Sequence, residues 1–209
     1  MRTALDFDRY YATPDPWRAK RATVRDRNLF RAIASIVRGK SVLELGCGEG
    51  HLTRTILGGA RSVRGVDISQ VAIERASKAQ IQNASFATAD FLNVPLSGYD
   101  VILAIECMYY LSEPERAEFL RKLSLEHANA IFAFSTPIIG GKYFSHHTAL
   151  ALLRGFDEVR WHNLTIYWSP ISARIAANMA KLPPFNFLVD RVPEPMVYQR
   201  LYVARVRQG

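Results

Sequence analysis

Cysteine is scarce in this sequence, and so are the patterns that bind metal ions. Only Cys47 and Cys107 occur among 209 residues, without a paired-cysteine spacing and without a histidine placed as their partner in a zinc motif. Cysteines in disulfide frameworks and zinc sites recur at short, regular spacings. We therefore expect neither a structural disulfide nor a metal site.

Long apolar runs are missing as well. A membrane-spanning helix requires roughly 18 or more consecutive apolar residues, and no stretch approaches that length. The opening residues, MRTALDFDRYYA, lack the apolar core of a signal peptide. These absences predict a cytoplasmic chain without a membrane partner.

The composition is that of one soluble domain. Apolar residues make up 49% of the chain and charged residues 22%, which is the range of globular proteins. A length of 209 residues suffices for one well-buried domain but is short for two. We therefore predict a single domain over residues 1–209.

The positive charge is concentrated in the amino-terminal part of the chain. Residues 1–40 carry ten Lys or Arg against four Asp or Glu, which accounts for +6 of the net +8. Apolar residues between Val24 and Val37 recur every three to four positions, which predicts an amphipathic helix. Its arginines have two interpretations, a solvated helix face or contact with an anionic substrate.

From residue 41 onward, short apolar runs alternate with helical stretches. This alternation predicts a mostly parallel, doubly wound α/β sheet with helices on both faces and ligands beyond the carboxyl ends of its strands. Ser69 and Ser112 are candidate N-caps, the second with Glu115 three residues on. Strands are predicted at 41–45, 61–67, 83–90, 100–106 and 129–135, and helices near 50–58, 69–80 and 113–125.

The alternation of short strands and helices changes after Pro137. Helices are predicted within 143–156 and 171–182, and strands over 159–168 and 196–207. We expect the two late strands to pair antiparallel at the edge of the sheet, with residues 171–195 as an insertion that contains several prolines.

Three glycines follow the first predicted strand in the stretch VLELGCGEGHL. Gly46, Gly48 and Gly50 permit backbone angles and close approaches that a Cβ would forbid, so a ligand can lie against bare backbone there. In a dinucleotide-binding fingerprint the third glycine stands five residues after the first. Here His51 takes that position, so the spacing disfavours NAD.

Glu44 stands two residues before the first glycine and brings a carboxylate to the same turn. Negative charge there would repel phosphates, but it suits a ligand that carries a cationic amino group. Together with the glycine spacing, this points to S-adenosylmethionine.

The stretch ELGCGEG and the five-strand alternation resemble the first motif and the core of the class I S-adenosylmethionine-dependent methyltransferases, over roughly residues 38–136. The resemblance implies a Rossmann-like sheet, mostly parallel with an antiparallel edge strand. It also implies S-adenosylmethionine as the cofactor, lying against the glycine turn that includes Cys47. The expected organisation is then an N-terminal helical lid (1–38), a cofactor-binding core (39–137) and a C-terminal substrate-side region (138–209).

Two further acids end predicted strands. Asp67 stands 21 residues after Gly46, where a carboxylate can accept two hydrogen bonds from ribose hydroxyls. The resemblance implies that Asp90 accepts a hydrogen bond from the adenine amino group and that the Phe91 amide meets the ring, although an aspartate at that position can also simply initiate a turn. Ile68 either supplies an apolar face to the adenine or belongs to the core.

The fourth predicted strand ends in AIECMYYL, where this family commonly places residues beside the transferred methyl group. Glu106 is a candidate to accept a proton from an attacking amine or hydroxyl, or to position the methionine end of the cofactor. Tyr109 is a candidate for the substrate pocket or for plain packing. Enzymes that methylate amino groups of nucleic-acid bases typically carry Asn or Asp, two prolines and an aromatic residue here, and this chain lacks that pattern.

His146 and His147 follow the fifth predicted strand. An imidazole titrates near neutral pH and can deprotonate a hydroxyl, so both are candidate catalytic bases. Because adjacent residues project differently from a helix, at most one of them is expected to point inward. The alternative is that both lie at the start of a surface helix.

The lead-in YYATPDPWRAK and the segment AIECMYYLSEPE are similar to the N-methyltransferase family of rhizobial nodulation, which methylates the sugar amine of chitooligosaccharide precursors. This resemblance implies an N-terminal lid over the cofactor. Trp17 is then a candidate cofactor contact, with Tyr10, Tyr11 and Arg21 as further closing residues. Trp17 alternatively anchors the lead-in to the core.

The sequence therefore predicts an S-adenosylmethionine-dependent methyltransferase that acts on an amine or hydroxyl of a small molecule, a sugar or saccharide being the favoured class. Two alternatives remain open at this stage. One is an RNA or DNA methyltransferase, and the other is a cofactor-binding partner subunit without catalytic activity. The sequence does not indicate an oligomeric state.

Overall fold

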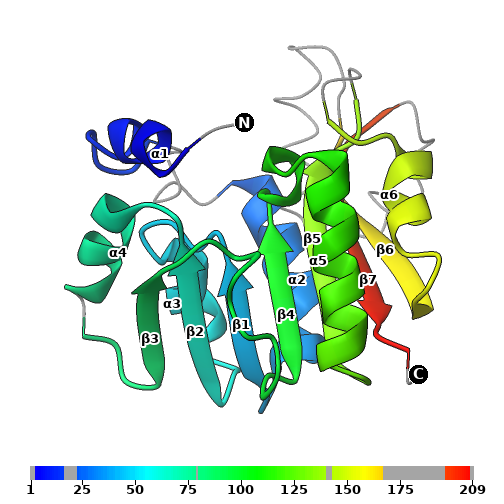
Figure 1. The fold of residues 1–209 in the computed structure, drawn as a ribbon, viewed down its shortest axis with the longest axis horizontal. Helices are drawn as coiled ribbons and strands as arrows, with labels where there is room; N and C mark the ends of the chain where they lie inside the picture. The colour runs from blue at the N-terminus through cyan, green and yellow to red at the C-terminus, as the bar shows by residue number, and fades with distance from the viewer. Residues whose placement is uncertain (1–2, 17–22, 79, 140–142, 167–195, 208–209) are drawn as a thin grey trace.

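In the parts of the chain that the structure describes, the fold is a seven-stranded sheet with helices on both sides (Figure 1). The computed structural model describes residues 3–16, 23–78, 80–139, 143–166 and 196–207. Within them the strand order is β3-β2-β1-β4-β5-β7-β6. The predicted α/β fold class is thereby confirmed.

The five core strands run parallel to one another, as the alternating pattern predicts. All five β1 positions are buried, because this strand lies in the middle of the sheet with helices on both sides. The core strands are β1 (Ser41–Leu45), β2 (Ser62–Asp67), β3 (Ala84–Thr88), β4 (Val101–Ile105) and β5 (Ile131–Pro137).

The two late strands extend the sheet beyond β5. β6 (Asp157–Ile166) and β7 (Val197–Arg205) pair antiparallel with each other, and β7 also pairs antiparallel with β5. The antiparallel strand, β7, thus lies one position inside the edge, and β6 forms the edge itself. The predicted helix at 171–182 and the insertion at 171–195 fall outside the described residues.

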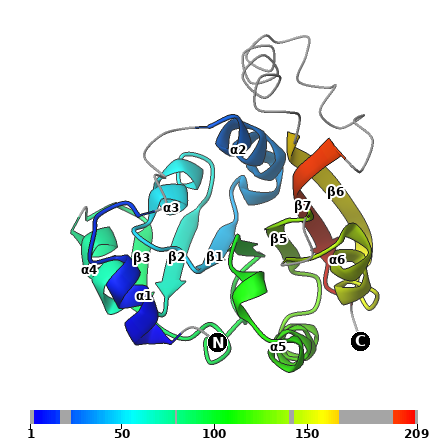
Figure 2. The same cartoon turned by 90° about the horizontal axis from the view of Figure 1, so that it is seen from above.

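Helices cover both faces of the sheet (Figure 2). On one face, α2 (Val24–Val37) and α3 (His51–Ile56) bury apolar side chains against β1, β2 and β4. On the other face, α5 (Glu113–Glu126), α6 (His146–Leu152) and the short 3-10 helix η1 (Met108–Tyr110) pack on a core rich in phenylalanine. Among the helices in the described parts of the chain, none is long and apolar enough to cross a membrane.

Both predicted N-caps are formed. Ser69 Oγ accepts a hydrogen bond from the Ala72 N–H at 3.1 Å at the start of α4 (Gln70–Ser77), which packs on β2 and β3. Ser112 and Glu115 form a capping box at the start of α5. These side chains satisfy N–H groups that a helix leaves without an internal partner.

The amino-terminal segment contains a short helix, α1 (Ala4–Tyr10), which the sequence pattern does not predict as a separate element. Thr3 and Asp6 close its first turn in a capping box. In Figure 1, α1 lies beside α4, on the side of the sheet where β1, β2 and β4 end. The segment therefore sits over the edge of the sheet at which ligands of α/β proteins bind.

Candidate active site

A cavity of about 360 Å³ opens at the carboxyl ends of the parallel strands. Its walls come from the strand ends, from the glycine turn and from residues 7–16 of the amino-terminal segment. Predicted site residues that line it are Glu44, Gly46, Cys47, Gly48, Asp67, Ile68, Asp90, Phe91, Glu106 and Tyr109. Trp17 lies outside the described residues.

The glycine turn adopts backbone angles that favour glycine at all three positions. The φ values of Gly46, Gly48 and Gly50 are +68°, +53° and +73°. A Cβ on Gly48 would collide with the hydroxyl of Tyr11, which reaches the turn from the amino-terminal segment. Gly50 does not line the cavity. A Cβ there would lie 2.8 Å from the Phe86 ring, so the glycine at this position allows close packing of the turn against Phe86.

Asp67 ends β2 with its carboxylate directed to the glycine turn. Its Oδ2 accepts a hydrogen bond from the Gly48 N–H at 2.8 Å, and its Oδ1 accepts one from the Ser69 N–H at 2.9 Å. Burial raises the pKa of Asp67 above its usual value, although both N–H donors act to lower it. The carboxylate is thus fixed in place at the cavity wall.

Residues that follow β3 form the next part of the wall. Asp90 Oδ1 accepts a hydrogen bond from the Leu92 N–H at 3.0 Å, which makes a small turn. Phe91 packs edge-on against Phe119 of α5, and with Ile68 it lends the cavity an apolar surface. A carboxylate between two apolar side chains can hold a flat ring that bears an amino group.

Glu44 is almost completely enclosed at the base of the cavity. It is 3% exposed, and the Thr53 hydroxyl donates to its Oε2 at 2.5 Å. Burial raises the pKa of Glu44 to about 8, and the nearby charge of Asp67 adds to this rise while the Thr53 hydrogen bond opposes it. A cationic ligand group would remove the cost of ionising this carboxyl.

Glu106 follows β4 and has a left-handed backbone, with φ +57°. Burial raises the pKa of its carboxyl, while a hydrogen bond from Ser135 and the charge of Arg25 lower it. Burial and the charge of Glu106 raise the pKa of Tyr109, so the Tyr109 hydroxyl keeps its proton and acts as a donor. Of the predicted catalytic side chains, Glu106 and Tyr109 are the two that reach the cavity.

His146 and His147 are not among the cavity-lining residues. His146 Nδ1 lies 2.9 Å from the Tyr202 hydroxyl, and its ring packs edge-on against Trp161. His147 is exposed at the start of α6. The structure thus places both histidines outside the lining of this cavity.

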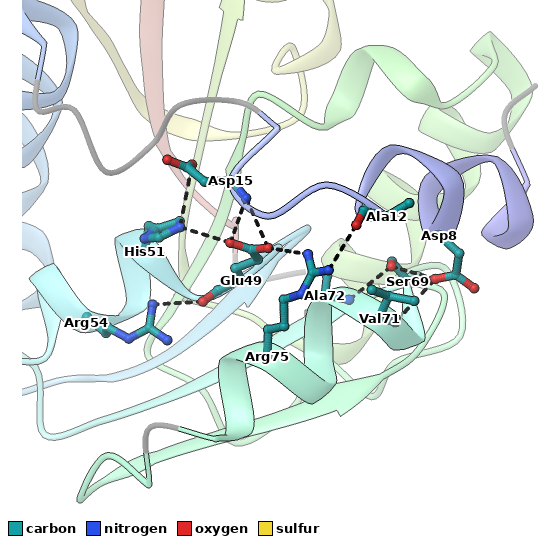
Figure 3. Close-up of polar contacts among 10 residues, drawn as sticks. All are labelled: Asp8, Ala12, Asp15, Glu49, His51, Arg54, Ser69, Val71, Ala72 and Arg75. Atoms are coloured by element: carbon teal, nitrogen blue, oxygen red, sulfur yellow. Dashed lines mark hydrogen bonds and ion pairs between the residues drawn. The ribbon is translucent and has the colours of Figure 1, made fainter.

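A polar network that the sequence analysis missed fastens the amino-terminal segment to the glycine turn (Figure 3). Its centre is Glu49, which is 7% exposed and stands inside the ELGCGEG motif. The Glu49 carboxylate accepts the Asp15 N–H at 3.2 Å and Arg75 Nη1 at 2.7 Å, and it lies 3.4 Å from His51 Nε2. Burial acts to raise the pKa of Glu49, but the hydrogen bonds from Arg75, Asp15 and His51, together with the charge of Arg75, hold it below its usual value.

A second fastening lies at the start of α4. Asp8 Oδ1 accepts hydrogen bonds from the Ser69 hydroxyl at 2.6 Å and the Val71 N–H at 3.3 Å. Arg75 also donates to the carbonyl of Ala12 at 3.4 Å. An acid placed between two motif glycines was the available sequence signal for Glu49, whereas Asp8 and Arg75 gave none.

The residues around the cavity fit S-adenosylmethionine. A Cβ at Gly46 would come within 2.9 Å of Cys107 Cβ, so this turn requires a bare backbone where it passes Cys107. Carboxylates accept hydrogen bonds from hydroxyl and amino groups, and they favour a cation over a phosphate. Among the described residues, no group of His, Cys, Asp and Glu side chains could hold a metal ion.

Comparisons with known proteins agree with this geometry. An uncharacterised methyltransferase of Anoxybacillus flavithermus is 27% identical over 139 residues, 65% of this chain and 65% of the relative. The crystal structure of the N-methyltransferase NodS from Bradyrhizobium japonicum WM9 with S-adenosyl-l-homocysteine is similar at a TM-score of 0.71 and 17% identity, with 98% of each chain covered. A putative methyltransferase in complex with the Trm112 activator of Haloferax volcanii is similar at a TM-score of 0.67 and 17% identity, with both chains fully covered.

The chain spans slightly less than two thirds of the length of the curated relatives that it matches. Residues 42–125 match the family model of the methyltransferase domain, and this segment contains the glycine turn and the strand-end acids. The segment is thus similar to that family, and the described chain has a fold similar to that of a methyltransferase whose structure contains S-adenosyl-l-homocysteine.

Proposed function

We propose that this protein transfers a methyl group from S-adenosylmethionine to an amine or hydroxyl of a small molecule, with sugars and saccharides as the first acceptor class to test. The observation that carries the proposal is the set of carboxylates around one cavity at adjacent strand ends, namely Glu44, Asp67, Asp90 and Glu106. The similarity to NodS, which is named an N-methyltransferase, supports an amine as the accepting group.

Each cavity residue then has a role that follows from its position. Asp67 accepts hydrogen bonds from the ribose hydroxyls, and Asp90 accepts one from the adenine amino group between Ile68 and Phe91. Glu44 faces the cationic end of the cofactor. These assignments use carboxylates that the fold already holds in place by backbone and side-chain donors.

The chemical step asks little of the protein beyond alignment. Bound S-adenosylmethionine supplies a methyl group already activated by its sulfonium. Orientation can contribute about 7 to 11 kcal/mol, whereas a general base contributes about 10² to 10⁴-fold. In this proposal the Glu106 carboxylate takes the proton that the attacking amine or hydroxyl of the substrate loses. The Tyr109 hydroxyl donates a hydrogen bond to that carboxylate.

Nucleic acid is the second candidate acceptor, because residues 1–40 are basic. The cavity itself opposes it. Its lining includes six carboxyl groups against one arginine, Arg25, and those carboxyl groups that are ionised repel phosphates. A steep fall of substrate affinity with salt would favour nucleic acid, since phosphate contacts release counterions.

A cofactor-binding subunit without catalytic activity is the other candidate. Isothermal titration with S-adenosylmethionine and S-adenosylhomocysteine, combined with measured release of S-adenosylhomocysteine over a panel of amino and hydroxyl sugars, separates the two. Turnover that is lost in Glu106→Gln supports the enzyme. Binding without turnover on any acceptor supports the subunit.

A further inference from the structure

Glu106 is held from behind by a residue of the neighbouring strand. Ser135, near the end of β5, donates from its hydroxyl to Glu106 Oε1 at 2.6 Å, and its carbonyl accepts the Glu106 N–H at 3.2 Å. The Ser135 side chain is completely buried. Both the backbone and the carboxyl of Glu106 are thus tied to one serine.

This double contact explains an unusual backbone. A non-glycine residue with φ near +57° is uncommon, and such a conformation persists only where the surroundings fix it. The Ser135 contacts fix it here, and they turn the Glu106 side chain into the cavity rather than along the sheet.

A second donor comes from β7. Gln199 is buried, and a hydrogen bond from its side chain acts to lower the pKa of the Glu106 carboxyl. The Gln199 Oε1 accepts the Thr165 hydroxyl of β6 at 3.3 Å, which leaves the amide NH₂ to donate to Glu106. A line of polar side chains therefore runs from the edge of the sheet to the cavity.

The neighbouring residue on β5 provides a contrast. Thr136 is as buried as Ser135, but its hydroxyl donates to the carbonyl of Pro137 at 3.0 Å. Successive side chains of a strand point to opposite faces. Thr136 therefore carries a buried hydroxyl on the same strand with no contact to Glu106.

We propose that Ser135 and Gln199 are positioning residues that keep the Glu106 carboxylate directed into the cavity. There it can accept a hydrogen bond, and then the proton, from the N–H or O–H group of the methyl acceptor. The role of Glu106 toward the methyl acceptor rests on the proposed function. The fixing of its carboxylate by Ser135 and Gln199 does not. The two residues touch neither the reacting atoms nor the cavity, so they act through Glu106.

The hold has an electrostatic consequence. Burial favours the protonated carboxyl and so raises the pKa of Glu106. The hydrogen bonds from Ser135 and Gln199 oppose this rise because they stabilise the charged carboxylate. Other charged or titratable groups near it are Arg25 of α2, Cys107 and Tyr109 beside it, and Tyr198 of β7. Removing the Ser135 hydroxyl leaves those groups in place, so the carboxyl should take up its proton at higher pH.

The test is a carbon-13 NMR titration of the full chain, labelled at the glutamate carboxyl carbons, without an acceptor. The Glu106 signal is assigned by its loss in Glu106→Gln. In Ser135→Ala its midpoint should rise by about one pH unit, the size expected for losing a hydrogen bond to a charged group. The Glu44 signal, with a pKa of about 8 and its own donor in Thr53, serves as an internal reference that should not move.

Matched variants make the outcome decisive. Thr136→Val removes the neighbouring buried hydroxyl and should leave the Glu106 midpoint unchanged, while Gln199→Leu should raise it. Ser135→Thr keeps the hydroxyl and should titrate like the parent. Unchanged midpoints in both Ser135→Ala and Gln199→Leu, or an equal rise in Thr136→Val, would overturn the proposal.

Turnover distinguishes this proposal from the proposed function. With an active acceptor, Ser135→Ala should shift the acid limb of the kcat/KM profile upward by the same amount as the NMR midpoint, with cofactor affinity nearly unchanged. If the acid limb of the kcat/KM profile were the same in Ser135→Ala as in the parent, the positioning role would be contradicted. An NMR shift without turnover on any acceptor would refute the proposed function and leave the hold on Glu106 intact.

Discussion

The two halves of the sheet use similar side chains for different purposes. At the ends of β1, β2 and β4, acids and tyrosines turn toward a common cavity. Around β6, β7 and α6, His146 is paired with Tyr202, and the buried Arg200 donates to Asn163 at 2.7 Å. In the first half the polar groups face a space for a ligand, and in the second half they face one another.

The position of each strand explains the difference. β1 lies between β2 and β4, so the chain leaves it in one direction for β2 and β3 and returns on its other side for β4 and β5. A crevice forms at such a switch in strand order. His146 follows β5, on the far side of β4 from this switch, and so finds packing partners instead of a ligand.

The largest effect is expected for Asp67→Ala. Loss of the proposed hydrogen bonds from Asp67 to the ribose should weaken cofactor binding by about one to three powers of ten in calorimetry. It should also cost stability, because the Gly48 and Ser69 N–H groups lose their acceptor. His146→Ala, the matched change in the other half, should cost stability and leave cofactor affinity unchanged; a loss of affinity there would break the comparison.

The next effect is the pH dependence of stability caused by Glu44. Its pKa is about 8 in the folded chain against 4.5 in the unfolded chain, so the folded state keeps a proton that the unfolded state has released between these values. The free energy of unfolding should therefore fall as pH rises from about 5 to 8, by at most roughly 1.4 kcal/mol per pH unit. Chemical denaturation at several pH values measures it, and an equally steep slope in Glu44→Gln would contradict the assignment.

A smaller effect is expected for Glu49→Ala, which removes the centre of the network that fastens residues 8–15. Cofactor affinity should fall about tenfold, the equivalent of one hydrogen bond to a charged group, and proteolysis within the amino-terminal segment should become faster. Asp100→Ala is the control, because Asp100 accepts the Ser41 N–H at 2.8 Å and pairs with Arg61 at the opposite end of the sheet. Equal losses of affinity in both variants would show that the network has no special link to the cavity.

The sequence predicted what depends on local pattern. The five core strands, the glycine turn and the acids at the strand tips follow from periodicity and spacing over a few residues, so the sequence alone placed Asp67 and Glu106 at strand ends, and both line the cavity. The assignment of His146 and His147 rested on residue type alone, and nothing local indicated that Tyr202, 56 residues later, would bind the first of them.

Contacts between distant segments were the part that sequence could not supply. Glu49 meets Asp15 across 34 positions, Asp8 meets Ser69 across 61, and Ser135 meets Glu106 across 29. Each pair depends on how α1, the glycine turn and the strand ends come together in space. The position of β7 inside the edge likewise depends on pairing that a strand pattern does not encode.

The central claim is that the bare turn and the carboxylates beside it bind S-adenosylmethionine. Calorimetric titration of the full chain with S-adenosylmethionine and S-adenosylhomocysteine tests this most directly. We predict saturable binding of one molecule per chain, weakened in Asp67→Ala. Absence of binding heat for both compounds up to millimolar concentration would contradict it.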